Sequence, residues 1–370
     1  MKALVIGGTG PSGPHLLNGL LARGYETAIL HRGVHEPEGL PEVRHIHADP
    51  HFPETLAEAV GDEEWDVIIA TYGRLKVTSQ VMAPRCGHFI GVGAVLAYLG
   101  AVEPYSATPS GMRILAREDG PTADEGNPPS KFGSMMVDAE RTAFENGAAH
   151  GTAVTTVRYP TIYGPRNVTP WEWTVVKRIL DGRQQMILPD SGLWLYTRCA
   201  ARNAAEALLR IVDNRQIAKG QIYNCADDDQ YSLRQIVELI CSKLGRNLEL
   251  VDIPSAIAPS IFFEWGAAEF RPPLLIDAQK IRRELGYADV ISAKTALEEV
   301  VDWLIEHPVT AAEYPTYRGW FDYNLEDRLI ASWHRAVARI REEAPDIPPS
   351  FAHPMPHPKK PSLTADESGR

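Results

Sequence analysis

Residues 3–13 read Ala-Leu-Val-Ile-Gly-Gly-Thr-Gly-Pro-Ser-Gly, and this stretch decides the fold. Its first four residues form an apolar run typical of a buried strand, and a leucine-rich pattern over residues 14–23 predicts a helix. Between them, Gly7, Gly10 and Gly13 stand three apart. That spacing suits a tight turn, a backbone that a phosphate can approach, and close packing of the helix on the strand. The stretch therefore predicts a dinucleotide-binding loop, with the pyrophosphate at the helix N-terminus.

The chain has 370 residues, of which 44% are hydrophobic and 23% charged, enough for a large α/β domain and a smaller one. Its formal net charge of −11 argues against a nucleic-acid partner, because phosphate backbones bind basic surfaces. No segment resembles a membrane span, and the first strand leaves no room for a signal peptide, so we expect a cytoplasmic protein without a membrane partner. The four widely spaced cysteines predict buried free thiols, and no metal site is expected.

Apolar runs alternate with helical patterns through the first half of the chain. Strands are expected over residues 3–6, 27–30, 43–48, 67–70, 89–92 and 153–157, and helices over 14–23, 53–60 and 138–150. Near-continuous apolar strands separated by helices indicate a parallel sheet covered on both faces. The predicted fold class is therefore α/β, with a Rossmann-type doubly wound parallel sheet in residues 1–165.

The regular alternation stops after residue 165. Further helices are expected over residues 171–182, 200–212 and 232–244, the last capped by Ser232. Residues 166–310 are predicted to form mainly a smaller, mostly helical substrate-binding lobe, with some segments returning to the first domain. A C-terminal helical extension is expected over residues 311–343, followed by a flexible tail over 344–370.

Taken together, these motifs resemble the extended short-chain dehydrogenases/reductases, the superfamily of nucleotide-sugar epimerases and dehydratases. The resemblance covers about residues 1–305 and rests on the glycine-rich stretch, on Asp49, and on the stretches 158–166, 220–224 and 277–287. It implies a Rossmann-type sheet that holds NAD or NADP, and a C-terminal lobe that holds a small-molecule substrate. It also implies a homodimer.

The resemblance assigns seven residues to the cofactor: Gly7, Thr9, Gly10, Ser12 and Gly13 in the loop, and Pro160 and Ile162 along the nicotinamide. Family members that use NAD carry an acidic residue at the end of the second strand, where this chain has His31-Arg32. An arginine there can pair with a 2′-phosphate, so we expect NADP. The alternative is NAD, with Arg32 as a solvated loop residue. Asp49 matches the family's adenine-binding aspartate, although it could instead cap the turn before Pro50.

The catalytic positions depart from the family. Ordinary members use a serine or threonine, a tyrosine that exchanges the substrate proton, and a lysine four residues later that lowers the tyrosine pKa. At the matching positions this chain has Ala94, Phe132 and Met136. None of these side chains titrates, so we expect none of them to take part in proton transfer.

Tyr72 and Lys76 are the expected replacement. They have the family's spacing and directly follow the fourth strand, at the mouth of the predicted cleft. Tyr72 is predicted to exchange the substrate proton. Lys76, one helical turn further along, is predicted to stabilise the phenolate of Tyr72. Arg74 is then left to bind a phosphate or an anionic substrate. The alternative is a helix N-terminus with charges that face solvent.

Nucleotide-sugar members commonly clamp a diphosphate with two arginines. Tyr196 stands in the place of one, and Arg271 matches the other. Aromatic residues gather in this half of the sequence instead, around Glu172. We therefore predict an aromatic-lined pocket with one carboxylate for a small, partly apolar substrate, although core or lid packing would explain each aromatic alone. The predicted substrate contacts are Arg74, Trp171, Trp173, Tyr196 and Arg271.

Two functions fit these observations. The first is an NADP(H)-dependent oxidoreductase, epimerase or dehydratase-like enzyme with non-standard catalytic residues. The second is a catalytically bare sensor of the same fold, which binds NADP(H) and regulates a partner. The aromatic lobe and the pair Tyr72–Lys76 favour the enzyme, and fold alone does not decide between the two.

Overall fold

The computed structural model describes residues 1–34, 36, 39–257, 272–310 and 320–344. The chain forms two compact units, Met1–Asp322 and Tyr323–Arg370. The tail expected over 344–370 lies, apart from residue 344, outside the described residues. All four cysteines are free thiols, three of them buried and Cys86 partly so, which fits the prediction.

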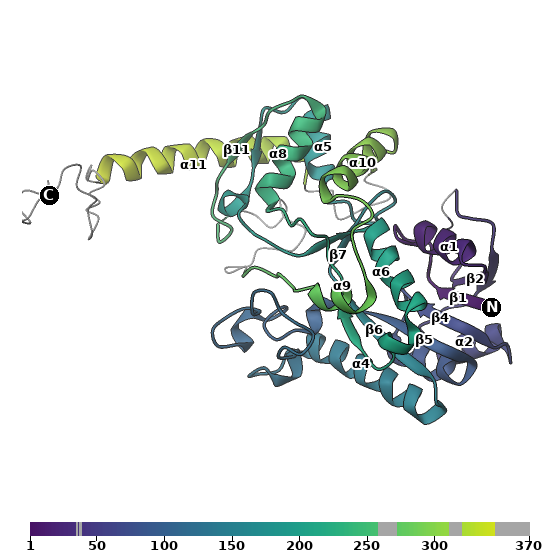
Figure 1. Ribbon diagram of the computed structural model, residues 1–370. Helices are drawn as coiled ribbons and strands as arrows, with labels where there is room; N and C mark the ends of the chain where they lie inside the picture. The colour runs from purple at the N-terminus through teal and green to yellow at the C-terminus, as the bar shows by residue number, and fades with distance from the viewer. Residues whose placement is uncertain (35, 37–38, 258–271, 311–319, 345–370) are drawn as a thin grey trace, which may run out of the picture. The chain divides into compact units, whose positions relative to one another are not determined.

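A seven-stranded parallel sheet forms the centre of the first unit (Figure 1). Its strands lie in the order β10-β6-β5-β4-β1-β2-β3. They are β1 (Lys2–Ile6), β2 (Glu26–His31), β3 (Arg44–His47), β4 (Trp65–Ala70), β5 (Cys86–Ala94), β6 (Ala153–Tyr159) and β10 (Ile222–Asn224). The first six strands have the order 3-2-1-4-5-6 of a doubly wound dinucleotide-binding sheet. The predicted fold class is therefore confirmed.

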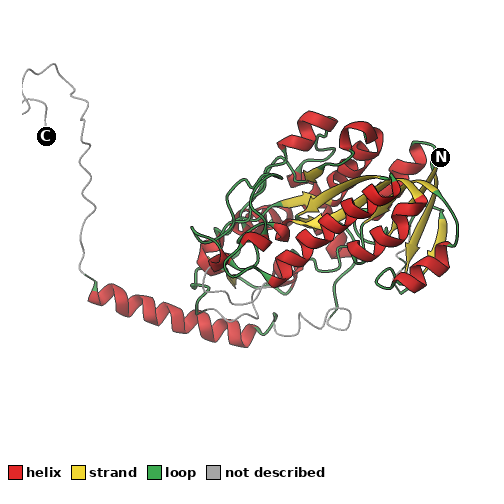
Figure 2. Ribbon diagram, turned by 90° about the horizontal axis from the view of Figure 1, so that it is seen from below, coloured by secondary structure: helices red, strands yellow, loops and turns green. Residues whose placement is uncertain are grey.

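Helices cover both faces of this sheet (Figure 2). Successive strand residues point to opposite faces, so Leu4 of β1 packs in one apolar cluster with α2, α3 and α4, and Val5 in another with α1, α6 and α9. The bounds are α1 (Gly13–Ala22), α2 (Pro53–Val60), α3 (Leu75–Met82), α4 (Lys131–His150), α6 (Ala201–Asp213), α7 (Arg215–Ala218) and α9 (Gln279–Leu285). Leu209 of α6 lies against Gly19 of α1, so α6, which follows residue 165, packs on a helix that covers the sheet.

The other elements of the first unit build a smaller lobe around a separate apolar cluster. They are α5 (Trp173–Leu180), α8 (Leu233–Leu244), α10 (Ala293–Glu306) and the paired strands β7 (Thr161–Tyr163) with β9 (Arg198–Ala200) and β8 (Gln185–Ile187) with β11 (Glu249–Val251). The predicted cap of α8 is confirmed, because Ser232 and Gln235 form a reciprocal capping box.

Helix α4 begins at Lys131, earlier than the helix predicted over 138–150. The hydroxyl of Ser130 accepts a hydrogen bond from the Gly133 N–H at 3.0 Å and caps the helix there. Gly133 weakens the helical pattern in the sequence, but it allows close packing: a Cβ at this position would lie 2.4 Å from Ala123. The extra turns place Phe132 and Met136 one turn apart on the same side of α4.

A buried ion pair ties α4 to the sheet. Arg158 of β6 donates hydrogen bonds to both carboxylate oxygens of Glu140 of α4, from Nη2 to Oε2 at 2.8 Å and from Nε to Oε1 at 3.0 Å, and both residues are buried. The Arg158 guanidinium also lies 4.5 Å from the ring centroid of Tyr98, whose hydroxyl donates to Asn224 of β10 at 2.8 Å. One charged group therefore joins α4, β6 and β10.

The second unit contains α11 (Tyr323–Glu343), which carries an ion pair between Arg339 and Glu343 one turn apart. The extension expected over 311–343 is helical from residue 323, and residues 311–319 lie outside the described part. Within the described ranges, every helix is either too short or too polar to cross a bilayer.

We predict that Glu140→Ala lowers the free energy of unfolding by about 3–5 kcal/mol, because it leaves the Arg158 guanidinium buried without its counter-ion. Urea denaturation followed by tryptophan fluorescence measures this loss. Glu145→Ala, on the exposed side of the same helix, is the control and should change the free energy by no more than about 0.5 kcal/mol. Equal effects of the two variants would contradict the role given to Glu140.

Candidate functional site

The glycine-rich loop lies at the point where the strand order reverses, between β1 and β4. Gly7 has φ +102°, and a Cβ there would lie 2.5 Å from the hydroxyl of Thr71. At Gly13 a Cβ would lie 1.8 Å from the carbonyl oxygen of Gly8, whereas at Gly10 it would meet nothing within 4 Å. The loop is thus tight at both ends and open in the middle. This shape fits a dinucleotide pyrophosphate at the N-terminus of α1.

The other expected loop residues lie beside this opening. Ser12 precedes α1 and its hydroxyl makes no capping bond to the helix, which leaves it available to a ligand. Thr9 is partly exposed. The contacts of both residues with a pyrophosphate stay a prediction.

Polar and aromatic side chains gather at the carboxyl ends of β2, β3 and β4. The guanidinium of Arg32 lies 5.6 Å from the ring centroid of Tyr72, and the ring of His51 meets Tyr72 edge-on at 5.1 Å. Asp49 Oδ1 lies 3.0 Å from the backbone nitrogen of His51 and 2.7 Å from its Nδ1. These bonds and the charge of Arg32 lower the pKa of Asp49. Asp49 therefore caps its turn, and an ionised carboxylate remains at the adenosine end of the expected cofactor site.

Tyr72 and Lys76 do not form the expected pair. Lys76 Nζ donates to Asp138 Oδ2 on α4 at 2.5 Å, while Tyr72 contacts Arg32 and His51. The i,i+4 geometry exists only inside a helix, and α3 does not begin until Leu75. Gly73, with φ +94°, turns the chain between the two residues. Arg74, expected to bind a phosphate or substrate, is the exposed residue that precedes α3.

A cavity of about 550 Å³ lies between the ends of β5 and β6 and the smaller lobe, with a mostly apolar lining. Two of the positions that replace the family's catalytic residues, Ala94 and Phe132, line it, and Met136 does not. Pro160 and Ile162, the residues expected along the nicotinamide, line it as well. The cavity therefore occupies the place where the resemblance puts the reaction.

Aromatic residues of the smaller lobe form much of the remaining wall. Trp171, Trp194 and Tyr196 line the cavity, and the rings of Trp194 and Tyr196 stack with centroids 4.7 Å apart. Trp173, also expected to contact substrate, instead starts α5 and is buried in the apolar cluster of the lobe. Two residues apart at a helix start, Trp171 and Trp173 face different directions. Arg271 lies outside the described residues.

One ion pair faces the cavity among the described lining residues. Glu172, 1% exposed, pairs with Arg198, 7% exposed. Burial alone would lower the pKa of Arg198, but the Glu172 carboxylate raises it, so the guanidinium stays charged. Arg198 also lies over the ring of Tyr163 at 4.1 Å, and among the described residues its buried Nε has no hydrogen-bond partner. The expected carboxylate is thus present, held by an arginine that no spacing in the sequence connects to it.

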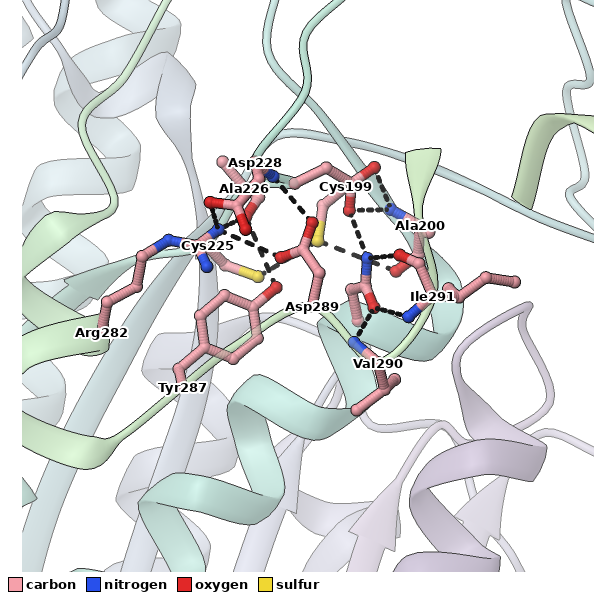
Figure 3. Close-up of polar contacts among 12 residues, drawn as sticks. Cys199, Ala200, Cys225, Ala226, Asp228, Arg282, Tyr287, Asp289, Val290 and Ile291 are labelled. Atoms are coloured by element: carbon pink, nitrogen blue, oxygen red, sulfur yellow. Dashed lines mark hydrogen bonds and ion pairs between the residues drawn. The ribbon is translucent and has the colours of Figure 1, made fainter. Parts of the chain in front are cut away.

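A second buried network holds β9, the strand that carries Arg198. Asp227 accepts hydrogen bonds from the Ala200 N–H at 2.9 Å, the Asn203 amide at 2.8 Å and the Tyr163 hydroxyl at 2.7 Å. The Asn203 side chain in turn accepts the backbone N–H groups of Val290 and Ile291. Figure 3 shows this region, with Ala200, Val290 and Ile291 near one another at its right-hand side. The network fixes the cavity wall that presents the Arg198 guanidinium.

Comparison with known proteins agrees with this arrangement. Residues 3–226 match the model of the NAD dependent epimerase/dehydratase family. A curated relative, the UDP-glucose 4-epimerase of Corynebacterium glutamicum, is 22% identical over 314 residues, which cover 78% of this chain and 90% of the relative.

Solved structures share the fold. The UDP-glucose 4-epimerase of Thermotoga maritima with UDP-glucose has a TM-score of 0.65 and 15% identity, over 83% of this chain and 99% of that one. The UDP-glucose 4-epimerase of Thermus thermophilus with NAD has a TM-score of 0.62 and 18% identity, over 84% and 100%. The dTDP-glucose 4,6-dehydratase of Bacillus anthracis with NAD has a TM-score of 0.61 and 17% identity, over 83% and 97%.

We predict that Gly10→Ala binds a nicotinamide dinucleotide at least about tenfold more weakly, a loss of about 1.4 kcal/mol, because the methyl group enters the open centre of the loop. Its free energy of unfolding should stay within about 1 kcal/mol of the parent, because in the described part of the chain no atom lies within 4 Å of the new methyl group. Calorimetric titration and urea denaturation measure the two effects. Unchanged affinity would show that the loop does not hold the pyrophosphate.

Proposed function

The chain belongs to the NAD dependent epimerase/dehydratase family, and we propose that it is a dinucleotide-dependent enzyme that oxidises or isomerises a small, largely apolar substrate. The observation that supports this most is the cavity, with its apolar and aromatic walls and its buried pair Glu172–Arg198. Ala94 and Phe132 face the same space without any group that could exchange a proton.

NADP(H) is the proposed cofactor, with NAD as the alternative. Arg32 supports it, because the guanidinium lies directly after β2, where a 2′-phosphate would need a cation. Tyr72 packs against Arg32 and so belongs to the adenosine end of the site in this proposal, away from the proton transfer. When bound, the nicotinamide would accept or supply the hydride. Solved structures of similar proteins are named with NAD. Measured affinities for the two cofactors decide between NADP(H) and NAD.

Glu172 is the proposed proton acceptor. Its carboxylate pairs with the Arg198 guanidinium, and a carboxylate can accept a proton from a substrate. The chemistry therefore starts with removal of a proton from the substrate, as in the oxidation of an alcohol. The guanidinium of Arg198, which lines the cavity, is then the proposed donor to a substrate oxygen. Lys76 has no part in this proposal, because it is paired with Asp138.

The proposed substrate is a small alcohol or hydroxy acid with an apolar or aromatic body. The walls of Trp171, Trp194 and Tyr196 offer stacking surfaces, and the cavity offers one charged pair among its described residues. A nucleotide diphosphate would need several cations, and Tyr196 stands where the resemblance puts one of the clamping arginines.

A sensor that binds NADP(H) without turnover is the second candidate. It is favoured by one specific observation: Ala94 and Phe132, which line the cavity, cannot titrate. Binding of the dinucleotide together with no consumption of it for any substrate would support the sensor.

We predict that NADPH binds more tightly than NADH, and that Arg32→Ala removes about 1.5–3 kcal/mol of binding free energy toward NADPH only, as expected for a charge-assisted hydrogen bond. Calorimetric titration with both cofactors tests this. Arg44→Ala is the matched control. Arg44 begins β3, at the end of the strand that lies away from the expected cofactor site, and it pairs with Glu63. If the parent chain binds NADH as tightly as NADPH, Arg32 does not hold a phosphate.

We predict that Glu172→Gln lowers turnover by about 10²–10⁴-fold, the usual share of general acid–base catalysis, with unchanged affinity for the dinucleotide. Turnover is followed at 340 nm with NADP⁺ and a panel of small aromatic and aliphatic alcohols. Because Glu172→Gln leaves Arg198 without its counter-ion, Glu172→Asp is made in parallel. The aspartate keeps the negative charge beside Arg198, so this variant should fold. Its shorter side chain holds the carboxylate further from the substrate, so it should also lose turnover. Full activity in a folded Glu172→Gln protein would remove Glu172 from the mechanism.

A further inference from the structure

A cluster of three imidazoles and one carboxylate lies at the outer edge of the sheet and shares no residue with the cavity. His31 is the last residue of β2, and His45 and His47 lie on the edge strand β3. The register pairs His31 with His47, and His45 stands two residues before His47. Because side chains two apart, and those of paired residues, point to the same face, the three rings share one side of the sheet. Glu36, from the loop between the strands, reaches the same point.

The four ligand atoms converge. His31 Nε2 lies 3.0 Å from His45 Nδ1, and His47 Nε2 lies 2.9 Å from Glu36 Oε1. The same carboxylate oxygen is 3.6 Å from His31 Nε2 and 3.7 Å from His45 Nδ1, and all four atoms lie within 4.8 Å of one another. A tetrahedral metal with bonds of about 2.0–2.1 Å holds its ligand atoms about 3.3–3.4 Å apart. Two of the observed separations, 2.9 and 3.0 Å, are shorter than this value, and two, 3.6 and 3.7 Å, are longer.

The ring planes support the same arrangement. The three imidazoles stand at 79°, 81° and 87° to one another, with centroids 5.0, 5.0 and 6.4 Å apart. Stacked rings would place their nitrogens side by side, whereas mutually perpendicular rings can direct one nitrogen each toward a common centre. His31 is also 4% exposed, so this nitrogen approaches the centre from the protein side.

We propose that His31, His45, His47 and Glu36 form a binding site for a divalent transition-metal ion, with zinc as the preferred ion. Three imidazole nitrogens and one carboxylate oxygen are ligands that Zn²⁺ takes in tetrahedral sites. Mg²⁺ and Ca²⁺ prefer oxygen ligands and should bind weakly.

The competing explanation is a metal-free set of hydrogen bonds. His31 Nδ1 accepts the N–H of Gly33 at 3.2 Å, so its Nε2 carries the proton and donates to His45, and His47 donates to Glu36. A metal at His31 Nε2 reverses this, because the ring proton must then sit on Nδ1. Nδ1 can no longer accept from Gly33, and the Gly33 N–H is released next to Arg32.

This reversal gives the site a consequence for the cofactor. A released backbone N–H beside Arg32 is a further donor for a 2′-phosphate, so metal binding should strengthen the binding of NADPH and leave that of NADH unchanged. The coupling rests on the proposed NADP(H) function, whereas the metal site does not.

The test uses the full chain without an affinity tag, stripped with a chelator and titrated with Zn²⁺ by calorimetry, and with Co²⁺ by visible absorption. We expect one ion per chain, the absorption bands of tetrahedral cobalt, and a rise in the unfolding temperature with Zn²⁺. His45→Ala and His47→Ala should each weaken zinc binding by more than roughly a hundredfold and lose the cobalt bands. Both side chains are partly exposed, 29% and 59%, so these variants should fold. His51→Ala, outside the cluster, is the control and should bind as the parent does.

Two results would overturn the site: no stoichiometric zinc in the stripped parent, or zinc binding that survives in the double variant His45→Ala/His47→Ala. NADPH titration with and without zinc tests the coupling, and we expect affinity to rise by roughly tenfold in the parent, as for one hydrogen bond to a charged group, and not in the double variant. Stoichiometric zinc with unchanged NADPH affinity would overturn the coupling and support the site alone.

Discussion

The buried ion pair between Arg158 and Glu140 is the interaction on which the arrangement of the site depends. It joins the middle of α4 to β6, and two charges inside a protein are tolerated only when their geometry and remaining hydrogen bonds are good. Because α4 cannot slide along the sheet without breaking both bonds, the first turn of this helix is fixed at the end of β5. Phe132 therefore stands at the cavity, in the place where the resemblance puts a catalytic tyrosine.

A second buried ion pair lies in the wall of the cavity that the smaller lobe forms. Glu172 and Arg198 are paired and nearly inaccessible, and the apolar walls strengthen electrostatic interactions between them and any polar group that enters. In this cavity the ion pair would orient a bound ligand and determine which ligands bind. Contact with the aromatic rings would supply most of the binding free energy. Such a division of roles suits a small apolar molecule with one oxygen function better than it suits a highly charged one.

The sequence predicted the sheet because the signals for β1, the glycine loop and α1 are local: each depends on residues within one element. The pairing of Tyr72 with Lys76 failed for a local reason too, since the positive φ of Gly73 delays the helix on which the spacing argument relied. Arg198 could not be found, because β9 and the turn before α5 meet only in the folded chain. His31 and His47 become neighbours only through the register of two strands, so spacing gives no sign of the cluster.

The most direct test of the central claim is a crystal structure of the chain with NADP⁺ bound, in which the position of the nicotinamide C4 atom is measured. Our account predicts the pyrophosphate on the glycine loop, the 2′-phosphate against Arg32, and C4 facing the cavity with the Glu172 carboxylate as the nearest acidic group. A nicotinamide ring outside the cavity, or a C4 atom closer to the Tyr72 hydroxyl than to Glu172, would contradict it.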